Sequence, residues 1–387
     1  MPVVNRIAAF SDEIAAWRRD FHEHPELDYD VHRTAGVVAE KLKAFGCDEV
    51  VTGLGRTGVV GVIRGRLPGS KVVGMRADMD ALPILEATGK PYASKTPGKM
   101  HACGHDGHTA MLLGAAKYLA ETRNFAGTAV VIFQPAEEGG GGAREMILDG
   151  LMERFGVTEV YGMHNMPGLP VGAFSMRSGP IMAAADRFTI EIEGKGAHAA
   201  RPHGSIDVVF ILSQIVTALQ GIVARNVDPL ASAVVSTTFM RAGETFNVLP
   251  QYGTLKGTVR TLDPEVQDLV QHRISEIVQG VCAMHGAKGT VDYVRGYPVT
   301  LNHDAQTRFA GRVAGEVVGA ENVDMAVAPV MGAEDFSYML ERRPGAMIFM
   351  GNGDTAGLHH HEYDFSDEAI PVGVSYWARL VETAMPA

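Results

Sequence analysis

The chain has 387 residues, of which 46% are hydrophobic and 20% are charged, and its formal net charge is −11. This length exceeds one ordinary core and predicts two or three domains, while the composition excludes a disordered, collagen-like or coiled-coil chain. The acidic balance provides no basic stripe to neutralise phosphates, so we expect no nucleic-acid partner.

The cysteine content indicates a reducing compartment. Cys47, Cys103 and Cys282 are odd in number and too few for a disulfide framework. Charged residues interrupt every apolar run in the first 27 residues, so this segment predicts neither a signal peptide nor a membrane span. We therefore expect a cytoplasmic protein without a membrane partner.

The first part of the chain alternates between helical and strand patterns. Apolar spacing typical of helices recurs over residues 12–22, 34–45, 109–121 and 145–150. Apolar runs typical of buried strands lie at residues 59–63, 71–77, 128–133 and 159–163. Strands that alternate with helices predict a three-layer α/β catalytic domain built on a mostly parallel sheet.

The pattern changes near Ala184. From Asp186 apolar and polar residues alternate, which is typical of antiparallel strands with one wet face. Further elements are predicted as a helix at 207–224, strands at 233–240 and 253–261, a helix at 264–285 and a strand at 291–295. This order predicts a ferredoxin-like α+β domain. The α/β pattern returns beyond residue 302, with a helix at 307–318, a strand at 346–350 and a final helix. We predict a catalytic domain in two parts, 1–184 and 299–387, with a lid or dimerisation domain inserted at 185–298.

Metal-binding side chains cluster in the stretch from Lys99 to His108. A thiolate and a neutral imidazole both donate to borderline metals such as zinc, and the Cys-x-His spacing lets Cys103 and His105 face a common point. Gly104 and Gly107 are expected to permit the tight turn through left-handed backbone conformations. By itself such a histidine-rich run can also be a solvated loop.

Similar side chains follow three of the predicted strands. Asp78 and Asp80 come after strand 71–77, Glu137 and Glu138 after strand 128–133, and His164 after strand 159–163. Because ligand groups collect at the carboxyl ends of strands in open α/β sheets, these positions predict one metal site. Asp78 and Asp80 could instead begin a turn before a proline. The four glycines at 139–142 do not indicate a phosphate loop, since no Lys-Ser/Thr follows and the preceding acids would repel phosphate.

Four motifs, in this order, carry a family resemblance: His-Ala-Cys-Gly-His-Asp-Gly-His at 101–108, Pro-Ala-Glu-Glu-Gly at 135–139, Met-His-Asn-Met-Pro at 163–167 and Leu-His-x-x-x-Tyr-Asp-Phe at 358–365. The chain resembles the metal-dependent aminoacylase and carboxypeptidase family, particularly its hippurate hydrolases and plant auxin-conjugate hydrolases. The similarity runs from Arg18 to the final helix. It implies an amidohydrolase that cleaves an N-acyl amino acid, a small-molecule substrate, into a carboxylic acid and an amino acid.

The resemblance also implies roles for individual residues. It gives two divalent metal ions per chain, zinc first and manganese, cobalt or nickel as alternatives, with the ligands Cys103, His105, Glu138, His164 and His359. Glu137 becomes the general base, which takes a proton from an activated water and returns it to the leaving amine. Asp80 would hold a ligand imidazole in its tautomer, or else merely cap a helix or turn.

From the inserted domain, the resemblance implies that His198 stabilises the oxyanion, in the family often from a neighbouring subunit. Asn247 and Arg260 would hold the substrate, because a guanidinium forks onto a carboxylate, although Arg260 could also be a surface strand arginine. A strand edge left free by the two long helices predicts a homodimer or homotetramer.

Some assignments stay open. His360 competes with His359 as the last ligand, and three more histidines are expected to be structural or to stand behind the ligands: His101, His108 and His203. A dipeptidase or carboxypeptidase on the same scaffold would need a site for a free amine, which the sequence does not show clearly. A metal-binding regulatory protein would have little reason to keep Glu137 beside Glu138.

Overall fold

The computed structural model describes residues 4–387, so the first three residues of the predicted catalytic domain lie outside it. The chain divides into two compact units. The first contains the residues up to Ile181, Leu301–Ala328 and Asp335–Ala387, and the second contains Met182–Thr300 and Pro329–Glu334. The return of residues 329–334 to the second unit is a feature that no sequence pattern indicated.

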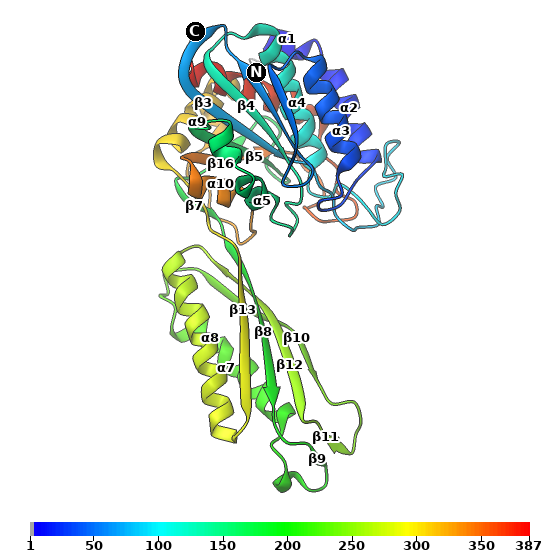
Figure 1. Cartoon of the computed structure of the whole chain (residues 1–387), viewed down its shortest axis with the longest axis vertical. Helices are drawn as coiled ribbons and strands as arrows, with labels where there is room; N and C mark the ends of the chain where they lie inside the picture. Colours follow the sequence, from blue (N-terminus) through cyan, green and yellow to red (C-terminus); the bar gives the residue numbers. More distant parts are fainter. Residues whose placement is uncertain (1–3) are drawn as a thin grey trace. The chain divides into compact units, whose positions relative to one another are not determined.

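An eight-stranded sheet forms the centre of the first unit (Figure 1). Its strands lie in the order β1 (Glu49–Leu54), β2 (Gly58–Arg64), β4 (Ala126–Gln134), β3 (Leu67–Asp78), β5 (Glu159–Met166), β16 (Gly345–Gly351), β6 (Phe174–Ser175) and β15 (Val323–Asp324). The four central strands from β4 to β16 are parallel, and β1 and β2 add an antiparallel edge. The mostly parallel α/β sheet predicted from the sequence is therefore confirmed.

Helices cover both faces of this sheet. One face packs against α2 (Ser11–Glu23), α3 (His32–Ala44), α4 (His105–Thr122), α9 (Asp304–Val318) and α11 (Ile370–Ala384). The other face is covered by short helices that include α5 (Gly142–Leu148) and α10 (Ser337–Arg342). Central strands such as β4 and β16 are buried on both faces, which explains their uninterrupted apolar runs.

The observed bounds differ from the predicted ones where they affect the site. Helix α4 begins at His105, four residues before the predicted start, so the Cys-x-His motif lies at its first turn. Strand β5 continues to Met166, so His164 lies within the strand. Strand β1 was not predicted, because it is an edge strand whose residues are mostly exposed or half-buried.

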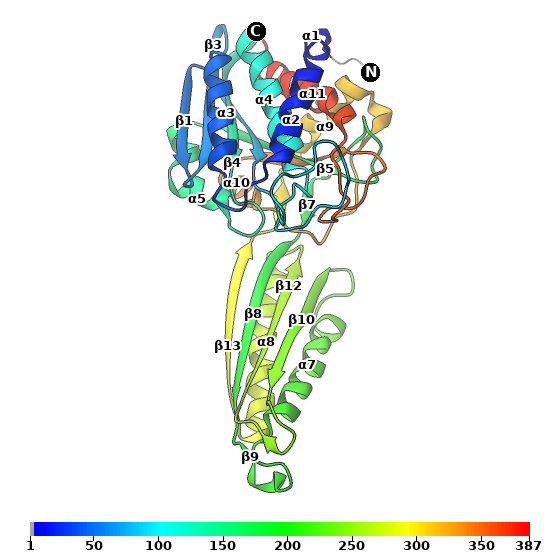
Figure 2. The same cartoon turned by 90° about the vertical axis from the view of Figure 1, so that its right-hand side faces the viewer.

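The second unit is an antiparallel sheet with both long helices on one face (Figures 1 and 2). Its strands lie in the order β10 (Ala233–Ala242), β12 (Tyr252–Thr261), β8 (Ala184–Glu193) and β13 (Lys288–Tyr297). Helix α7 (Val208–Arg225) follows β8, and α8 (Pro264–His285) follows β12. This is the ferredoxin-like arrangement.

The sequence specifies the two helices of the second unit locally. Asp207 caps α7 by accepting the main-chain N–H groups of Val209 and Phe210, and Asp263 caps α8, whose first residue is Pro264. By length and composition α7 could cross a membrane. In the structure, however, it buries one stripe of apolar side chains against the sheet, as a core helix does.

Candidate metal centre

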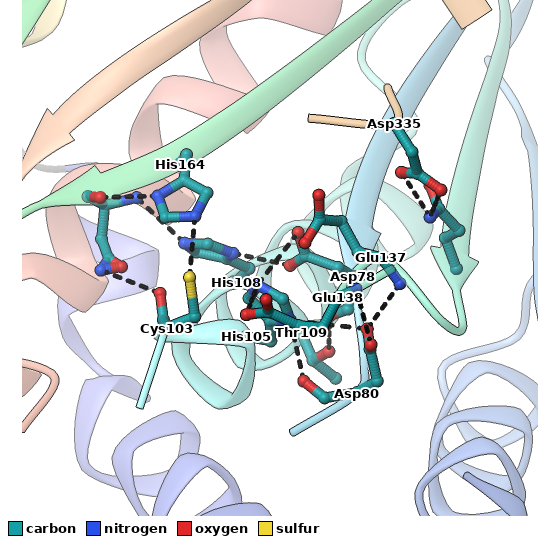
Figure 3. A network of polar contacts seen from close by, with 12 residues as sticks. Asp78, Asp80, Cys103, His105, His108, Thr109, Glu137, Glu138, His164 and Asp335 are labelled. Carbon is teal, nitrogen blue, oxygen red and sulfur yellow. Dashed lines mark hydrogen bonds and ion pairs between the residues drawn. The ribbon is translucent and has the colours of Figure 1, made fainter. Parts of the chain in front are cut away.

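The predicted metal-binding side chains of the first unit meet at the carboxyl ends of its central strands (Figure 3). Three overlapping groups have their ligand atoms within 4.8 Å of one another. They are Cys103 with His105 and His164, Cys103 with Glu138 and His359, and His105 with Glu137 and Glu138. All six side chains therefore surround one small volume, although they come from four separate segments.

The turn before α4 places Cys103 and His105. Gly104 has φ of 92°, and a Cβ there would lie 2.1 Å from the side-chain oxygen of Asn165, so only glycine fits this turn. Gly107 was expected to share this role, but it is helical. Its missing side chain instead lets α4 approach Phe365, whose ring would lie 2.3 Å from a Cβ.

Two ligand histidines are held by main-chain carbonyl groups. His105 Nδ1 donates to the carbonyl of Asp80 at 2.8 Å, and His164 Nδ1 donates to the carbonyl of Asn165 at 2.6 Å. In both rings the Nε2 atom is then the one that faces the cluster, and His164 Nε2 lies 3.3 Å from Cys103 Sγ. Fixing Nδ1 in this way is how proteins orient imidazoles toward a metal.

Asp80 contacts both the His105 ring and the turn that carries the two glutamates. Its main-chain carbonyl accepts from His105 Nδ1 at 2.8 Å, and its carboxylate lies 3.5 Å from the same nitrogen. The carboxylate also accepts the main-chain N–H groups of Glu137 and Glu138, each at 3.0 Å. The residue before them, Ala136, has φ of 54°, a strained conformation for a residue with a side chain. Asp80 therefore stabilises the turn that presents both glutamates.

The three histidines of the last motif differ in the groups that they contact. His359 has φ of 63°, and its Nε2 lies 3.4 Å from Glu138 Oε1. All three histidines are exposed, but His360 and His361 group with Glu362 instead. The geometry thus favours His359 over His360 as the residue that faces the cluster.

The electrostatics of the cluster favour bound cations. Burial opposes a charge on His105, but Asp78, Asp80 and Glu138 outweigh it and raise the pKa of His105 to about 10. Burial and the neighbouring glutamates raise the pKa of the Cys103 thiol well above its usual value. Burial, with a contribution from His108, lowers the pKa of His164 to about 3, which keeps it neutral as a ligand must be.

The unsatisfied atoms of the cluster show that divalent metals fit. Among residues 4–387, the buried atoms His105 Nε2 and Glu138 Oε1 have no hydrogen-bond partner, and such atoms are rare in folded proteins without a reason. A thiolate, imidazoles and carboxylates are the donors of zinc and similar ions, and a nearby cation also lowers the pKa of a buried thiol. The chain therefore carries a site for divalent metal ions.

Sequence reasoning missed the polar groups behind this cluster. Asp78, considered only as a strand-end acid or a turn residue, bonds Arg76 and His108 at 2.7 Å each. Arg76 also reaches Gln134 and Asp335. An arginine inside the buried strand β3 was the available signal, because a charge in such a position needs partners.

His101 is buried with the pKa lowered to about 3 by burial, and His203 is exposed in a short turn.

The second unit holds the other predicted residues. His198 in β9 (Ala197–His198) pairs with Val248 of β11 (Val248–Leu249), and the main-chain carbonyl of Asn247 accepts the N–H of Ala199. His198 and Asn247 are thus neighbours on one exposed two-stranded ribbon. Arg260 is near the far end of β12, paired with Ala185 and Val234, so within this unit it is not brought to the ribbon.

Comparisons with known proteins place the chain among metal-binding hydrolases. Residues 74–383 match Peptidase family M20/M25/M40. The chain is 43% identical to the hippurate hydrolase of Campylobacter jejuni over 98% of both proteins, and 39% identical to an N-acetylcysteine deacetylase of Bacillus subtilis over 96% of this chain and 97% of the relative. A dinuclear metal-binding peptidase of the M20 family from Bacillus subtilis, 35% identical, superposes with a TM-score of 0.86 over 98% of this chain and 99% of that one. The chain therefore belongs to peptidase family M20/M25/M40.

Proposed function

We propose that this protein is a metal-dependent amidohydrolase that cleaves the amide bond of N-acyl amino acids to a carboxylic acid and a free amino acid. The observation that carries the proposal is the pair Glu137 and Glu138, two adjacent carboxylates that both belong to the metal cluster. Relatives that act on hippurate and N-acetylcysteine support the class of substrate.

The ligands that we assign to two divalent ions, with zinc first and manganese, cobalt or nickel as alternatives, are Cys103, His105, Glu138, His164 and His359. Ions bound there lower the pKa of water and polarise the scissile carbonyl group. Cys103, His105 and Glu138 each belong to two of the three ligand groups, so these three residues link the groups to one another.

Glu137 is assigned as the general base. Its side chain is buried beside the cluster, and Asp80 fixes its main chain. From there the carboxylate takes a proton from the attacking water and returns it to the leaving amine. Burial raises the pKa of Glu138, but the close contact with His359 and the charges of nearby histidines outweigh it and lower that pKa, so Glu138 stays ionised as a ligand.

The second unit is assigned the substrate contacts. His198 Nδ1 accepts the main-chain N–H of Ala200 at 3.1 Å, so the neutral ring carries its proton on Nε2 and can donate it to an oxyanion. Arg260 bonds neutral oxygens, those of Thr258 and Val259, and can bind the carboxylate of the substrate without first breaking an ion pair. Asn247 would help to orient the substrate.

We further infer a homodimer or a tetramer of dimers in a reducing, cytoplasmic compartment. The edge strand β10 of the second unit has an open side and exposes Phe239 and Met240, which favours pairing with a second copy. All three cysteines are free thiols, as a reducing compartment requires.

The test is a hydrolysis assay of metal-depleted protein reconstituted separately with zinc, manganese and cobalt. Hippurate and N-acetylcysteine are the positive substrates, and Glu137→Gln is the matched inactive variant. We expect that variant to bind metal as the wild type does and to lose about 10²–10⁴ in kcat, because the proton-transfer group is gone. Near wild-type turnover by Glu137→Gln would remove the assigned base.

A carboxypeptidase is the second candidate, because the matching family is one of peptidases. N-blocked dipeptides distinguish the two activities. Higher kcat/KM on these than on N-acyl amino acids with simple acyl groups would identify a carboxypeptidase. A requirement for a free amine would identify a dipeptidase.

A further inference from the structure

A network of buried polar side chains stands behind the metal cluster, and Figure 3 labels three of its members, Asp78, His108 and Asp335. Arg76, Asp78, Gln134 and Asp335 are each at most 1% exposed. The Arg76 guanidinium donates to Gln134 at 2.8 Å, to Asp78 Oδ2 at 2.7 Å and to Asp335 at 3.0 Å. Asp335 also accepts the main-chain N–H of Ala143 at 2.9 Å, so it joins β3, β4 and the start of α5.

Asp78 extends the network to the strand that carries His164. Its Oδ1 accepts a hydrogen bond from His108 Nδ1 at 2.7 Å. His108 Nε2 accepts the main-chain N–H of Asn165 at 3.0 Å, which places the ring proton on Nδ1. The backbone beside His164 is therefore linked to Arg76 through two side chains.

Fold stability does not account for so many buried charges. Burying a guanidinium and two carboxylates carries a desolvation penalty, and apolar side chains of similar volume often stabilise a fold as well or better. Every charge here is hydrogen-bonded, and each bond fixes the direction of the next side chain. The network is therefore suited to orienting groups.

His105 shows what this orientation achieves. Asp78 Oδ2 lies 3.6 Å from His105 Nε2, too far for a hydrogen bond, because Arg76 holds that oxygen. His105 Nε2 thus has no hydrogen-bond partner among the described residues, and it lies near Cys103, His164 and Glu138, whose Oε1 atom is 3.9 Å away. With Arg76 absent or displaced, Asp78 could turn toward Nε2 and engage the atom that a metal ion needs.

We propose that Arg76 and Asp335 are positioning residues for the metal site. Asp335 fixes Arg76, Arg76 restrains Asp78, and Asp78 orients His108 while leaving His105 Nε2 available. This inference rests on the proposed function only in taking His105 and His164 as metal ligands.

The test measures metal retention, which is independent of hydrolysis. Zinc-loaded wild type, Asp335→Asn and Arg76→Lys are each titrated with a competing chelator, and the unfolding temperature of each metal-free protein is recorded. Asp335→Asn keeps the shape of the side chain but weakens its interaction with the Arg76 guanidinium. Arg76→Lys keeps the positive charge but not the three directed hydrogen bonds. We expect about 10–100-fold weaker zinc binding in both, the usual effect of removing a partner behind the ligands.

Asp186→Asn is the matched control. Asp186 is equally buried in the second unit and accepts bonds from Gln267, Tyr293 and the main chain of Gly296, much as Asp335 does from its own partners. This control should lower the unfolding temperature and leave zinc affinity unchanged. Both network variants could instead bind zinc within about twofold of wild type and have lowered unfolding temperatures, as the control does. That outcome would show that the network has only a structural role. Should Asp335→Asn not fold, Arg76→Lys decides by the same criterion.

The outcome is also separable from the proposed function. Weaker zinc binding in the variants of a wild type that hydrolyses no N-acyl amino acid would support the positioning role and remove the proposed activity. Unchanged zinc binding in the variants of a wild type that hydrolyses N-acyl amino acids would remove the positioning role and support the proposed activity.

Discussion

Asp80 accepts the main-chain N–H of Glu137 on one carboxylate oxygen and the N–H of the next glutamate on the other, each at 3.0 Å. Removing both acceptors in Asp80→Ala should loosen the turn behind the strained Ala136 and displace the general base. We expect kcat to fall by about 10–100-fold, as when a partner behind catalytic groups is lost.

Asp149→Ala is the control for this variant. Asp149 also accepts a main-chain N–H, that of Gly55 at 2.8 Å, but it is no member of the metal cluster. Its kcat should stay near wild type. A kcat for Asp80→Ala as high as that of Asp149→Ala would show that the turn does not need its carboxylate.

The metal site predicts the outcome of elemental analysis. Wild-type protein should contain up to two divalent ions per chain, and Cys103→Ala or His164→Ala should lower this content sharply, because each removes a donor from the cluster. Cys282→Ala is the matched control, since that thiol is buried in the apolar core of the second unit. Full metal content in the first two variants would refute the ligand assignment.

Much of the fold was readable from the sequence because long elements carry their own periodicity. Helix α8 has the bounds that were predicted for it, and the central strands were recognised from apolar runs. Short edge strands such as β1 were not predicted, because their burial is partial and depends on the neighbouring strand. The termini of elements were predicted less closely, as the early start of α4 at His105 shows.

The site was predictable as a set of residues and not as a geometry. Strand-end positions indicated which side chains collect, since parallel strands share an edge. They could not indicate that Asp80 acts through both its carbonyl and its carboxylate. Nor could they pair Arg76 with Asp335, whose bond spans 259 residues and depends on how the chain returns to the first unit.

A substrate with a free carboxylate α to the amide should be required if Arg260 binds it. Amidating that carboxylate should lower the kcat/KM of the wild type. The lysine of Arg260→Lys should not replace the arginine in this preference for a free carboxylate, because an ammonium lacks the bidentate fork. Arg187→Lys, a substitution of an exposed arginine on the neighbouring strand β8, is the control and should leave the preference intact. Equal kcat/KM for free and amidated substrates would remove this role.

The stability of the first unit should depend on pH through His22. Burial opposes its charge, yet hydrogen bonds to Asp106 at 2.9 Å and Glu86 at 3.3 Å raise the pKa of His22 from 6.5 to about 9. Because the folded-state pKa is the higher one, this stabilisation is complete below pH 6.5 and is lost as the pH rises through 9. The free energy of unfolding of wild type and of His22→Gln is measured in denaturant at pH 6 and at pH 10. The difference between the two proteins should therefore be smaller at pH 10 than at pH 6. A difference that does not change with pH would exclude a charged His22.

His198 should be essential without touching the metal content. It lies in the second unit on an exposed ribbon, and its ring is set to donate from Nε2. Loss of one oxyanion donor lowers kcat by about 10²–10³, so His198→Ala should be nearly inactive while it retains its metal ions. His203→Ala, an exposed histidine in the turn that follows, is the control and should stay active.

Mixed subunits then show from which chain His198 acts. His198→Ala subunits keep Glu137, and Glu137→Gln subunits keep His198, so each homo-oligomer is inactive. If the histidine acts across a subunit interface, a mixed dimer contains one complete site and recovers up to about half the wild-type activity per dimer, since its other site lacks both groups. If it acts within its own chain, every site in the mixture lacks one group and activity stays at the level of the separate variants. Subunit exchange is verified by mass spectrometry of differently labelled chains, so an inactive mixture that has exchanged fully would assign His198 to its own chain or to a structural role.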